Sequence, residues 1–229
     1  ARFTPQEKGT YSYIFRYKED GKTASETAPA TFKAAKGKGK GILHTADNST
    51  LVYDNGEPFR GVGINLCWES RTNDDSKFFK ALHEQHDRFS YDVMLPDFAA
   101  NGGNFTRMWM CSWNFPIDRK ERFNNHRYTA TAEYMNPSAV SHLDEVIRLA
   151  EDLDIKIMLC MGQGDVRANR GFFNDEDAKA RYRNYLRYIV ARWGYSPAIG
   201  MWEFFNEIDN IQHRDRNGVI PAAEIVAWH

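Results

Sequence analysis

The stretch IGMWEFFNE, residues 199–207, is the most informative part of this 229-residue sequence for the fold. It is an apolar run that follows a turn at Pro197 and ends in the polar pair Asn206 and Glu207, as expected of a buried β-strand. Three earlier segments have the same character, at 59–67, 103–111 and 155–161. Amphipathic helical patterns alternate with these strands. The sequence therefore predicts an α/β fold in which βα units build a parallel sheet.

Two of the intervening helices have clear boundaries. One begins after Asn136, a helix-capping residue followed by proline, and carries an apolar stripe from Val140 to Leu153. The other begins near Asn174, has three acidic residues in its first turn and ends at Gly194. We expect both helices to cover a face of the sheet.

The first sixty residues have a different pattern, with short β segments and turns. Aromatic residues alternate along 11–17, which predicts one half-buried strand, and the turn EDGK follows at 19–22. A second short strand is expected at 31–33. Residues 51–59 predict a hairpin around the turn DNGE at 54–57.

Composition and charge limit the possible partners. Lys plus Arg number 30 against 31 Asp plus Glu, so the formal net charge is −1 and no nucleic-acid partner is expected. Cys67, Cys111 and Cys160 form neither a disulfide framework nor a metal-binding CxxC pattern, which favours buried thiols. No apolar run approaches the roughly 20 residues of a membrane span. Aromatic residues make up 14% of the chain and suit either a large core or flat sugar ligands.

Three of the predicted strands carry family-like motifs. WEFFNE at 202–207 resembles the end of the fourth barrel strand of clan A retaining glycoside hydrolases, the cellulase and mannanase type. GNFTRMW at 103–109 resembles the second strand of that clan, and GVGINLCW at 61–68 resembles the first. The resemblance implies a TIM (β/α)8 barrel, which normally occupies about 250 residues. Because only four strands are predicted, we expect the chain to be the first half of such a barrel, truncated after the fourth strand.

The resemblance extends less specifically to the N-terminus. Residues 1–58 resemble the end of a β-sandwich module that precedes such barrels. We therefore expect a partial β-sandwich module at 1–41 and the N-terminal half of the barrel at 42–229. One departure concerns the third strand, where some families of the clan place a histidine and this chain has MGQGD at 161–165.

The resemblance also implies roles for individual residues. Glu207 would be the catalytic acid/base, Asn206 would bind the sugar 2-hydroxyl, and Arg107 would lie beside the nucleophile, a glutamate on the seventh strand and outside this chain. A retaining enzyme needs two carboxyl groups about 5–5.5 Å apart, of which Glu207 supplies one. We expect a neighbouring carboxylate and partial burial to raise its pKa.

Each role has an alternative that the sequence leaves open. Glu207 could be an ordinary surface carboxylate, and Arg107 could be a structural barrel residue paired with Glu203. Trp68, Trp109 and Trp113 lie at or beyond strand ends, where they could stack on sugar rings or simply pack. The long polar and aromatic segment 114–136 follows the second strand, and we expect it to help wall a substrate cleft.

The expected function is hydrolysis of β-glycosidic bonds in a plant-type polysaccharide, β-glucan or β-mannan, by retaining double displacement. An exo-acting glycosidase of the same clan and a non-catalytic carbohydrate-binding barrel are the alternatives. No metal or organic cofactor is implied, because two carboxylates suffice. The expected partner is a polysaccharide or oligosaccharide, and the expected location is secreted or periplasmic, with no signal peptide in this chain.

Overall fold

The computed structural model describes residues 2–5, 7–37, 39–69, 89–121, 128–162, 173, 175–208 and 220–229. The chain divides into two compact units, Ala1–Lys40 and Gly41–His229. The expected domain bounds, 1–41 and 42–229, stay a prediction. The assignment of the first unit to a β-sandwich module stays a prediction.

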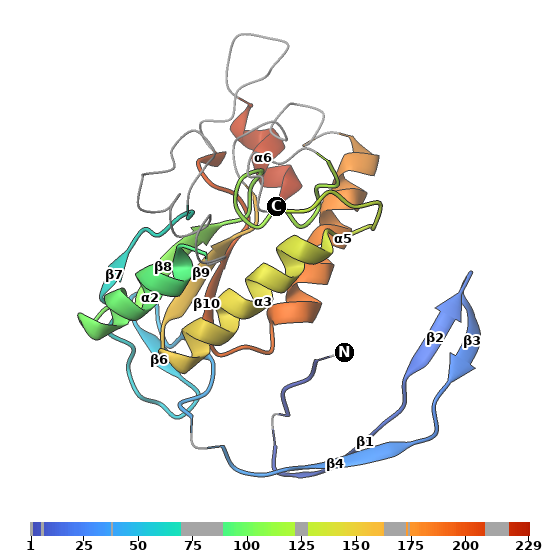
Figure 1. Cartoon of the computed structure of the whole chain (residues 1–229), viewed down its shortest axis with the longest axis horizontal. Helices are drawn as coiled ribbons and strands as arrows, with labels where there is room; N and C mark the ends of the chain where they lie inside the picture. Colours follow the sequence, from blue (N-terminus) through green and yellow to red (C-terminus); the bar gives the residue numbers. More distant parts are fainter. Residues whose placement is uncertain are drawn as a thin grey trace. The chain divides into compact units, whose positions relative to one another are not determined.

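The first unit consists of two short antiparallel ribbons (Figure 1). Strand β1 (Gly9–Tyr13) pairs with β4 (Ala30–Ala34), and β2 (Arg16–Glu19) pairs with β3 (Lys22–Glu26). The predicted turn joins β2 to β3, and β4 contains the predicted strand at 31–33. The prediction of one half-buried strand along 11–17 is wrong. This stretch is divided between β1 and β2 and is mostly exposed, because a two-stranded ribbon has no second layer to cover it.

The second unit opens with a hairpin of β5 (Leu43–Thr45) and β6 (Leu51–Tyr53). The predicted turn after β6 is present, since the backbone N–H of Tyr53 donates to the carbonyl of Glu57 over 2.9 Å. The strand partner of β6, however, is β5, which the sequence pattern did not reveal.

A four-stranded parallel sheet in the order β10-β9-β8-β7 forms the centre of this unit. Each predicted strand segment contains one of its strands: β7 (Gly63–Ile64), β8 (Phe105–Trp109), β9 (Lys156–Cys160) and β10 (Ile199–Glu203). The parallel α/β sheet is thereby confirmed.

Strand β7 is much shorter than the predicted 59–67 because side chains of the neighbouring chain segment replace ladder bonds. The Asn104 side chain accepts from the backbone N–H of Val62 over 2.7 Å, and the Thr106 hydroxyl accepts from that of Leu66 over 3.2 Å. The backbone before and after β7 is thus held against β8 without regular pairing.

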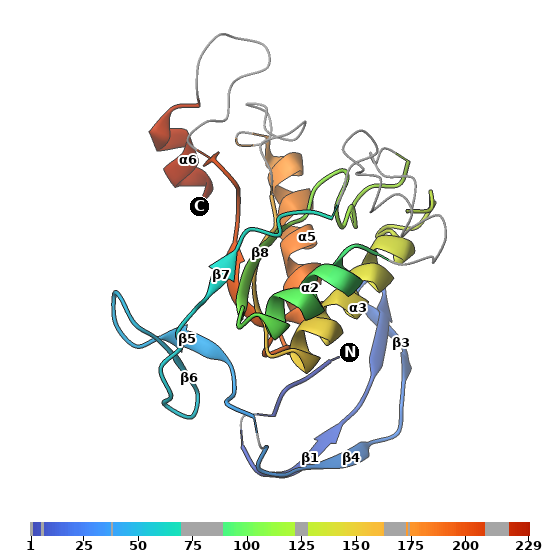
Figure 2. The same ribbon diagram turned by 60° about the vertical axis from the view of Figure 1, so that its left-hand side comes forward.

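Helices α2 (Tyr91–Ala100), α3 (Pro137–Asp152) and α5 (Glu176–Trp193) lie on the same side of the sheet in both ribbon views (Figures 1 and 2). A short helix, α6 (Ala222–Trp228), ends the chain. The predicted starts of α3 and α5 are confirmed, with Asn136 and Asp175 as their N-caps. One core lies between the helices and the sheet. Its fully buried members include Leu95, Met108, Leu143, Ile147, Ile157, Leu159, Ile189 and Trp193.

The two faces of the sheet differ in burial. Along β8 the residues alternate, with Thr106 and Met108 fully buried while Phe105, Arg107 and Trp109 are half-buried. Because successive side chains of a strand point to opposite faces, the half-buried set stands on the face opposite the helices. That face corresponds to the interior of a barrel.

A β-bulge in β10 decides which face Glu203 occupies. The pairing of β10 with β9 slips by one residue at Gly200, whose added Cβ would lie only 3.0 Å from the side chain of Lys156. Before the slip, buried Ile199 faces the helices. One extra residue exchanges the two faces of a strand, so beyond Gly200 the side chain of Glu203 stands on the face that carries Arg107.

The cap of α3 also ties the long segment before it to the helix. Asn136 is 1% exposed, and its side-chain oxygen accepts from the backbone N–H groups of Ser138 and Ala139. Its amide group donates to the carbonyl oxygens of Arg119 over 3.1 Å and Thr129 over 3.0 Å. One buried side chain therefore holds the helix start and both sides of the segment.

We expect Asn136→Ala to destabilise the full natural protein well beyond a normal cap loss. A cap contributes about 1 kcal/mol, and each buried group left without a partner costs about 1–3 kcal/mol. The matched control is Asp175→Ala, because exposed Asp175 caps α5 through one bond from the N–H of Ala178. Urea unfolding measures both. Equal losses in the two variants would contradict this role of Asn136.

Candidate active site

The site is built around an ion pair at the carboxyl end of the sheet. Arg107 on β8 donates from Nε to Oε2 of Glu203 on β10 over 2.6 Å and from Nη2 to its Oε1. The side chains are 17% and 20% exposed, and they meet across β9, which lies between their strands. The hydrogen bonds that Arg107 donates to Glu203 raise the pKa of Arg107 above its ordinary value. This structure therefore contains the pairing of Arg107 with Glu203 that the sequence left open as an alternative.

The same guanidinium also reaches Asn206. Arg107 Nη2 donates to Asn206 Oδ1 over 2.7 Å, and the Asn206 backbone N–H donates to the Gly162 carbonyl over 2.9 Å. Gly162 is required here because an added Cβ would lie 2.5 Å from the Phe205 ring and 2.7 Å from the Phe204 carbonyl. The loops after β9 and β10 are therefore in direct contact, with Asn206 buried between strand end and loop.

Glu207 directly follows this buried asparagine and is exposed. Its φ of 49° lies in the left-handed region, which is uncommon for a residue other than glycine. Such a conformation turns the chain sharply away from the strand direction, and it concentrates at functional sites. The partial burial expected for the Glu207 carboxyl is not present in this structure.

The three candidate tryptophans form one cluster beside the ion pair. The ring centroid of Trp68 lies 5.0 Å from that of Trp109 and 6.0 Å from that of Trp113. The Arg107 guanidinium carbon lies 5.1 Å from the centre of the Trp109 ring, a cation–π contact. All three rings are half-buried, so each packs against protein while keeping part of its surface accessible.

Some of the predicted site features fall partly outside the described residues. Of the segment MGQGD, Met161 and Gly162 are described and 163–165 are not. Of the segment 114–136, residues 122–127 lie outside the description, while its first part contributes Phe115 and Ile117 to the core with no exposed surface. The expected role of this segment in a substrate cleft stays a prediction.

Sequence reasoning missed the importance of Gly162 and of the thiols near the pair. Cys160 on β9 is buried and donates to the Gly162 carbonyl over 2.9 Å. Half-buried Cys67 precedes Trp68, and its nearness to Arg107 counteracts the rise that burial causes in its pKa. Neither cysteine lies in a recognisable motif, so the pattern gave no signal beyond burial.

Comparison with known proteins supports the barrel fold. The chain matches no protein-family model. Mannan endo-1,4-β-mannosidase A of Podospora anserina is 24% identical over 131 residues, which cover 51% of this chain and 35% of that protein. The chain thus spans about a third of the length of this relative.

Three solved structures share the fold with higher coverage of the chain. A Bacteroides vulgatus protein assigned to the glycoside hydrolases matches 99% of this chain and 42% of its own, with a TM-score of 0.62 and 18% identity. The exo-β-1,4-mannosidase from Opitutaceae bacterium strain TAV5 matches 81% and 31%, with a TM-score of 0.56 and 18% identity. The endo-1,4-β-mannanase from Rhizomucor miehei matches 82% and 55%, with a TM-score of 0.54 and 15% identity. The fold class and the resemblance to glycoside hydrolase barrels are confirmed.

We predict that Cys160 resists alkylation in the folded protein. Burial, together with the nearby charge of Glu203, raises the pKa of its thiol to about 12. The thiolate is the reactive form, so Cys160 stays protonated and unreactive below that pH. Iodoacetamide labelling followed by peptide mass spectrometry should show, at every pH between 7 and 9, modification far slower than in the unfolded protein, with a rate that keeps rising with pH and does not level off near pH 9. Urea-unfolded protein is the control, in which labelling should follow an ordinary thiol pKa of about 8.5. Rapid native labelling at pH 8 contradicts the prediction.

Proposed function

We propose that this chain supplies the acid/base half of a retaining β-mannan hydrolase, with Glu207 as the acid/base. The observation that carries the proposal is the hydrogen bond from Arg107 to Asn206 at the carboxyl end of parallel strands, directly before exposed Glu207. In (β/α)8 enzymes the active site lies at this end of the strands. The motif resemblance and the barrel fold support the same assignment.

The bond to Arg107 determines how Asn206 can contact a substrate. A guanidinium only donates hydrogen bonds, so the Asn206 side chain must turn its oxygen toward Arg107. Its amide nitrogen is then directed elsewhere and can donate to a sugar 2-hydroxyl. Hydrogen bonds to this hydroxyl strengthen in the oxocarbenium-like transition state of glycoside hydrolysis.

Glu203 is unsuited to be the second catalytic carboxylate. Both of its oxygens accept hydrogen bonds from Arg107, so the whole carboxylate is engaged in one bidentate ion pair. We assign Glu203 the task of orienting Arg107, and we expect the nucleophile on another part of the complete barrel. In this scheme Glu207 first protonates the leaving oxygen and then, as a base, takes a proton from the water that hydrolyses the glycosyl-enzyme.

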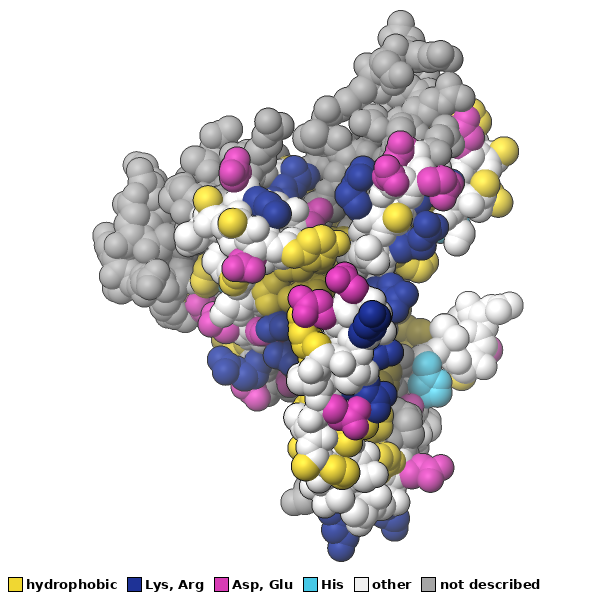
Figure 3. All heavy atoms as spheres, turned by 90° about the vertical axis from the view of Figure 1, so that its right-hand side faces the viewer, with side chains coloured by type: hydrophobic (Ala, Val, Ile, Leu, Met, Phe, Trp, Pro, Cys, Tyr) yellow, Lys and Arg dark blue, Asp and Glu magenta, His cyan; other side chains and the backbone are white. Residues whose placement is uncertain are grey.

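The relatives favour mannan among the polysaccharides that the sequence left open. The curated relative is named for endo-acting cleavage of β-1,4-mannan, and two of the structural neighbours are named as a mannanase and a mannosidase. Since these include endo- and exo-acting enzymes, both modes remain candidates for the natural protein. An uncharged polymer also fits the near-neutral chain, and acidic and basic side chains are intermixed on the face drawn in Figure 3.

The proposed substrate implies a location. Polymeric mannan does not cross a membrane, so we propose that the natural protein acts outside the cytoplasm, secreted or periplasmic. Within the described residues, no helix combines the length and hydrophobicity that crossing a bilayer requires.

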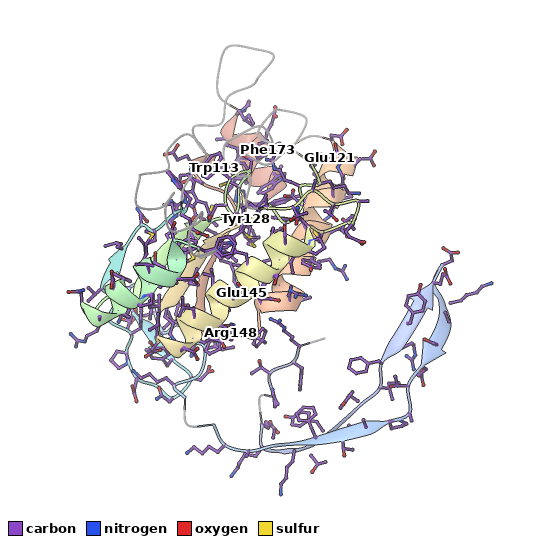
Figure 4. All side chains as sticks on the ribbon, in the orientation of Figure 1. Trp113, Glu121, Tyr128, Glu145, Arg148 and Phe173 are labelled. Atoms are coloured by element: carbon purple, nitrogen blue, oxygen red, sulfur yellow. The ribbon has the colours of Figure 1, made fainter. Side chains whose placement is uncertain are left out.

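We expect Glu207→Gln in the full natural protein to lower kcat on β-mannan by about 10²- to 10⁴-fold, the usual contribution of general acid catalysis. A dinitrophenyl β-mannoside needs no proton for departure, so its glycosylation step should be largely spared. The matched control is Glu145→Gln on the exposed side of α3 (Figure 4), which should leave both rates unchanged.

Two results would count against this assignment. If Glu207→Gln lowered kcat equally on the polymer and on the aryl mannoside, Glu207 would not be the general acid. A wild-type protein that binds mannan without cleaving it would favour the non-catalytic carbohydrate-binding barrel. Product lengths from wild-type digestion distinguish endo from exo action.

A further inference from the structure

Three buried polar side chains, Glu69, His142 and Tyr128, contact one another in sequence. We call them the buried relay. Their side chains come from the segment after β7, from α3 and from the segment after β8. They are 5%, 2% and 4% exposed. His142 Nε2 lies 2.9 Å from Glu69 Oε1, and His142 Nδ1 lies 3.1 Å from the Tyr128 hydroxyl. The relay thus joins two consecutive βα units, β7–α2 through Glu69 and β8–α3 through Tyr128 and His142.

Backbone groups at both ends of the relay determine its polarity. The Phe115 N–H donates to the Tyr128 hydroxyl oxygen over 3.0 Å, and the Ser90 N–H donates to Glu69 Oε2 over 2.7 Å. A phenol that accepts from Phe115 can donate its own hydrogen to His142 Nδ1. Nε2 then carries the imidazole hydrogen, and it lies within contact distance of Glu69 Oε1 although the two atoms are not in hydrogen-bond geometry.

Phe115, which the relay holds at its N–H, is in an unfavourable conformation. Its φ is 49° and its side chain is fully buried. A left-handed conformation is unfavourable for a residue with a Cβ, so surrounding contacts must impose it. The bond to Tyr128 is one such contact, and the His142 ring, 5.1 Å from the Phe115 ring, is another.

The turn that ends at Phe115 carries one of the candidate sugar-contacting rings. Cys111 and Asn114 pair across this turn, with Trp113 inside it. The Asn114 amide donates to the Trp109 carbonyl over 2.9 Å, so the turn is also fixed to the end of β8. In the view of Figure 4, Tyr128 lies between α3 and Trp113.

We propose that Tyr128 is a positioning residue that sets Trp113 for sugar binding, with His142 and Glu69 holding Tyr128 in place. The proposal rests on the proposed function, since it treats the tryptophan cluster as part of the substrate site. Tyr128 acts through the Phe115 N–H and the turn that presents Trp113. It touches neither the substrate nor the reacting atoms.

The test is Tyr128→Phe in the full natural protein, which removes only the hydroxyl between Phe115 and His142. We expect KM for a manno-oligosaccharide to rise about tenfold with kcat within about twofold, because binding of the sugar chain is lost while the acid/base is untouched. The control is Asp144→Asn on the same helix. Asp144 accepts from Arg192 and Trp193 on α5, so its loss lowers stability without reaching the turn.

A double-mutant cycle with Trp113→Ala decides whether the effect passes through Trp113. If it does, Tyr128→Phe should raise KM no further once Trp113 is absent. Additive effects, or an unchanged KM in Tyr128→Phe, overturn the proposal. A KM shift of equal size in Asp144→Asn also overturns it, because general destabilisation would then suffice.

Tryptophan emission gives a readout that does not depend on activity. Tyr128→Phe should shift the emission spectrum of the wild-type protein, and the shift should vanish in a Trp113→Phe background. A protein without activity on mannan or glucan would refute the proposed function alone. A spectrum unaffected by Tyr128→Phe would refute the positioning role alone.

Discussion

The ion pair between Arg107 and Glu203 is the interaction on which the rest of the site depends. It connects β8 and β10 across the intervening strand, and the same guanidinium orients Asn206 beside Glu207. Removing water from a charged pair costs free energy, and apolar residues often stabilise a protein interior as well or better. We therefore regard the pair as a means of fixing geometry. Both partners form directed bonds, so each limits the orientation of the other.

This pair depends on the β-bulge at Gly200, a residue without a side chain. If Gly200 were paired with β9 like the other residues of β10 and did not form a bulge, Glu203 would stand on the helix-covered face of the sheet, away from Arg107. A second glycine, Gly162, lets the loop after β9 approach Phe205 and accept the Asn206 N–H. Two glycines thus position the polar groups of the site. Gly200 within β10 determines the position of Glu203, and Gly162, which follows β9, allows the contact that holds Asn206.

The elements that local sequence determines could be predicted. Helices α3 and α5 begin at capping side chains, Asn136 and Asp175, and their apolar stripes face the core. The four parallel strands lie within apolar runs because both faces of such a sheet are partly covered. Arg107 and Asn206 were each assigned to the site from the family that the motifs resemble.

Features that depend on residues far apart in the sequence could not be predicted. The shortness of β7 results from Asn104 and Thr106, about forty residues further along the chain. His142 lies on the apolar face of α3, where the sequence pattern predicts only core packing. The fold brings Glu69 and Tyr128 close to its ring nitrogens. The bulge at Gly200 lies in a continuous apolar run, in which periodicity gives no sign of a change of face.

The most direct test of this account is a crystal structure of the full natural protein carrying Glu207→Gln, with mannotriose bound. The account predicts a sugar with its 2-hydroxyl within hydrogen-bonding distance of Asn206 Nδ2 and its glycosidic oxygen within reach of residue 207. A second sugar should lie against the tryptophan cluster, with Arg107 still bonded to Glu203. Mannotriose bound away from the carboxyl ends of β8 and β10, or an Asn206 side chain that turns its oxygen toward the sugar, would contradict it.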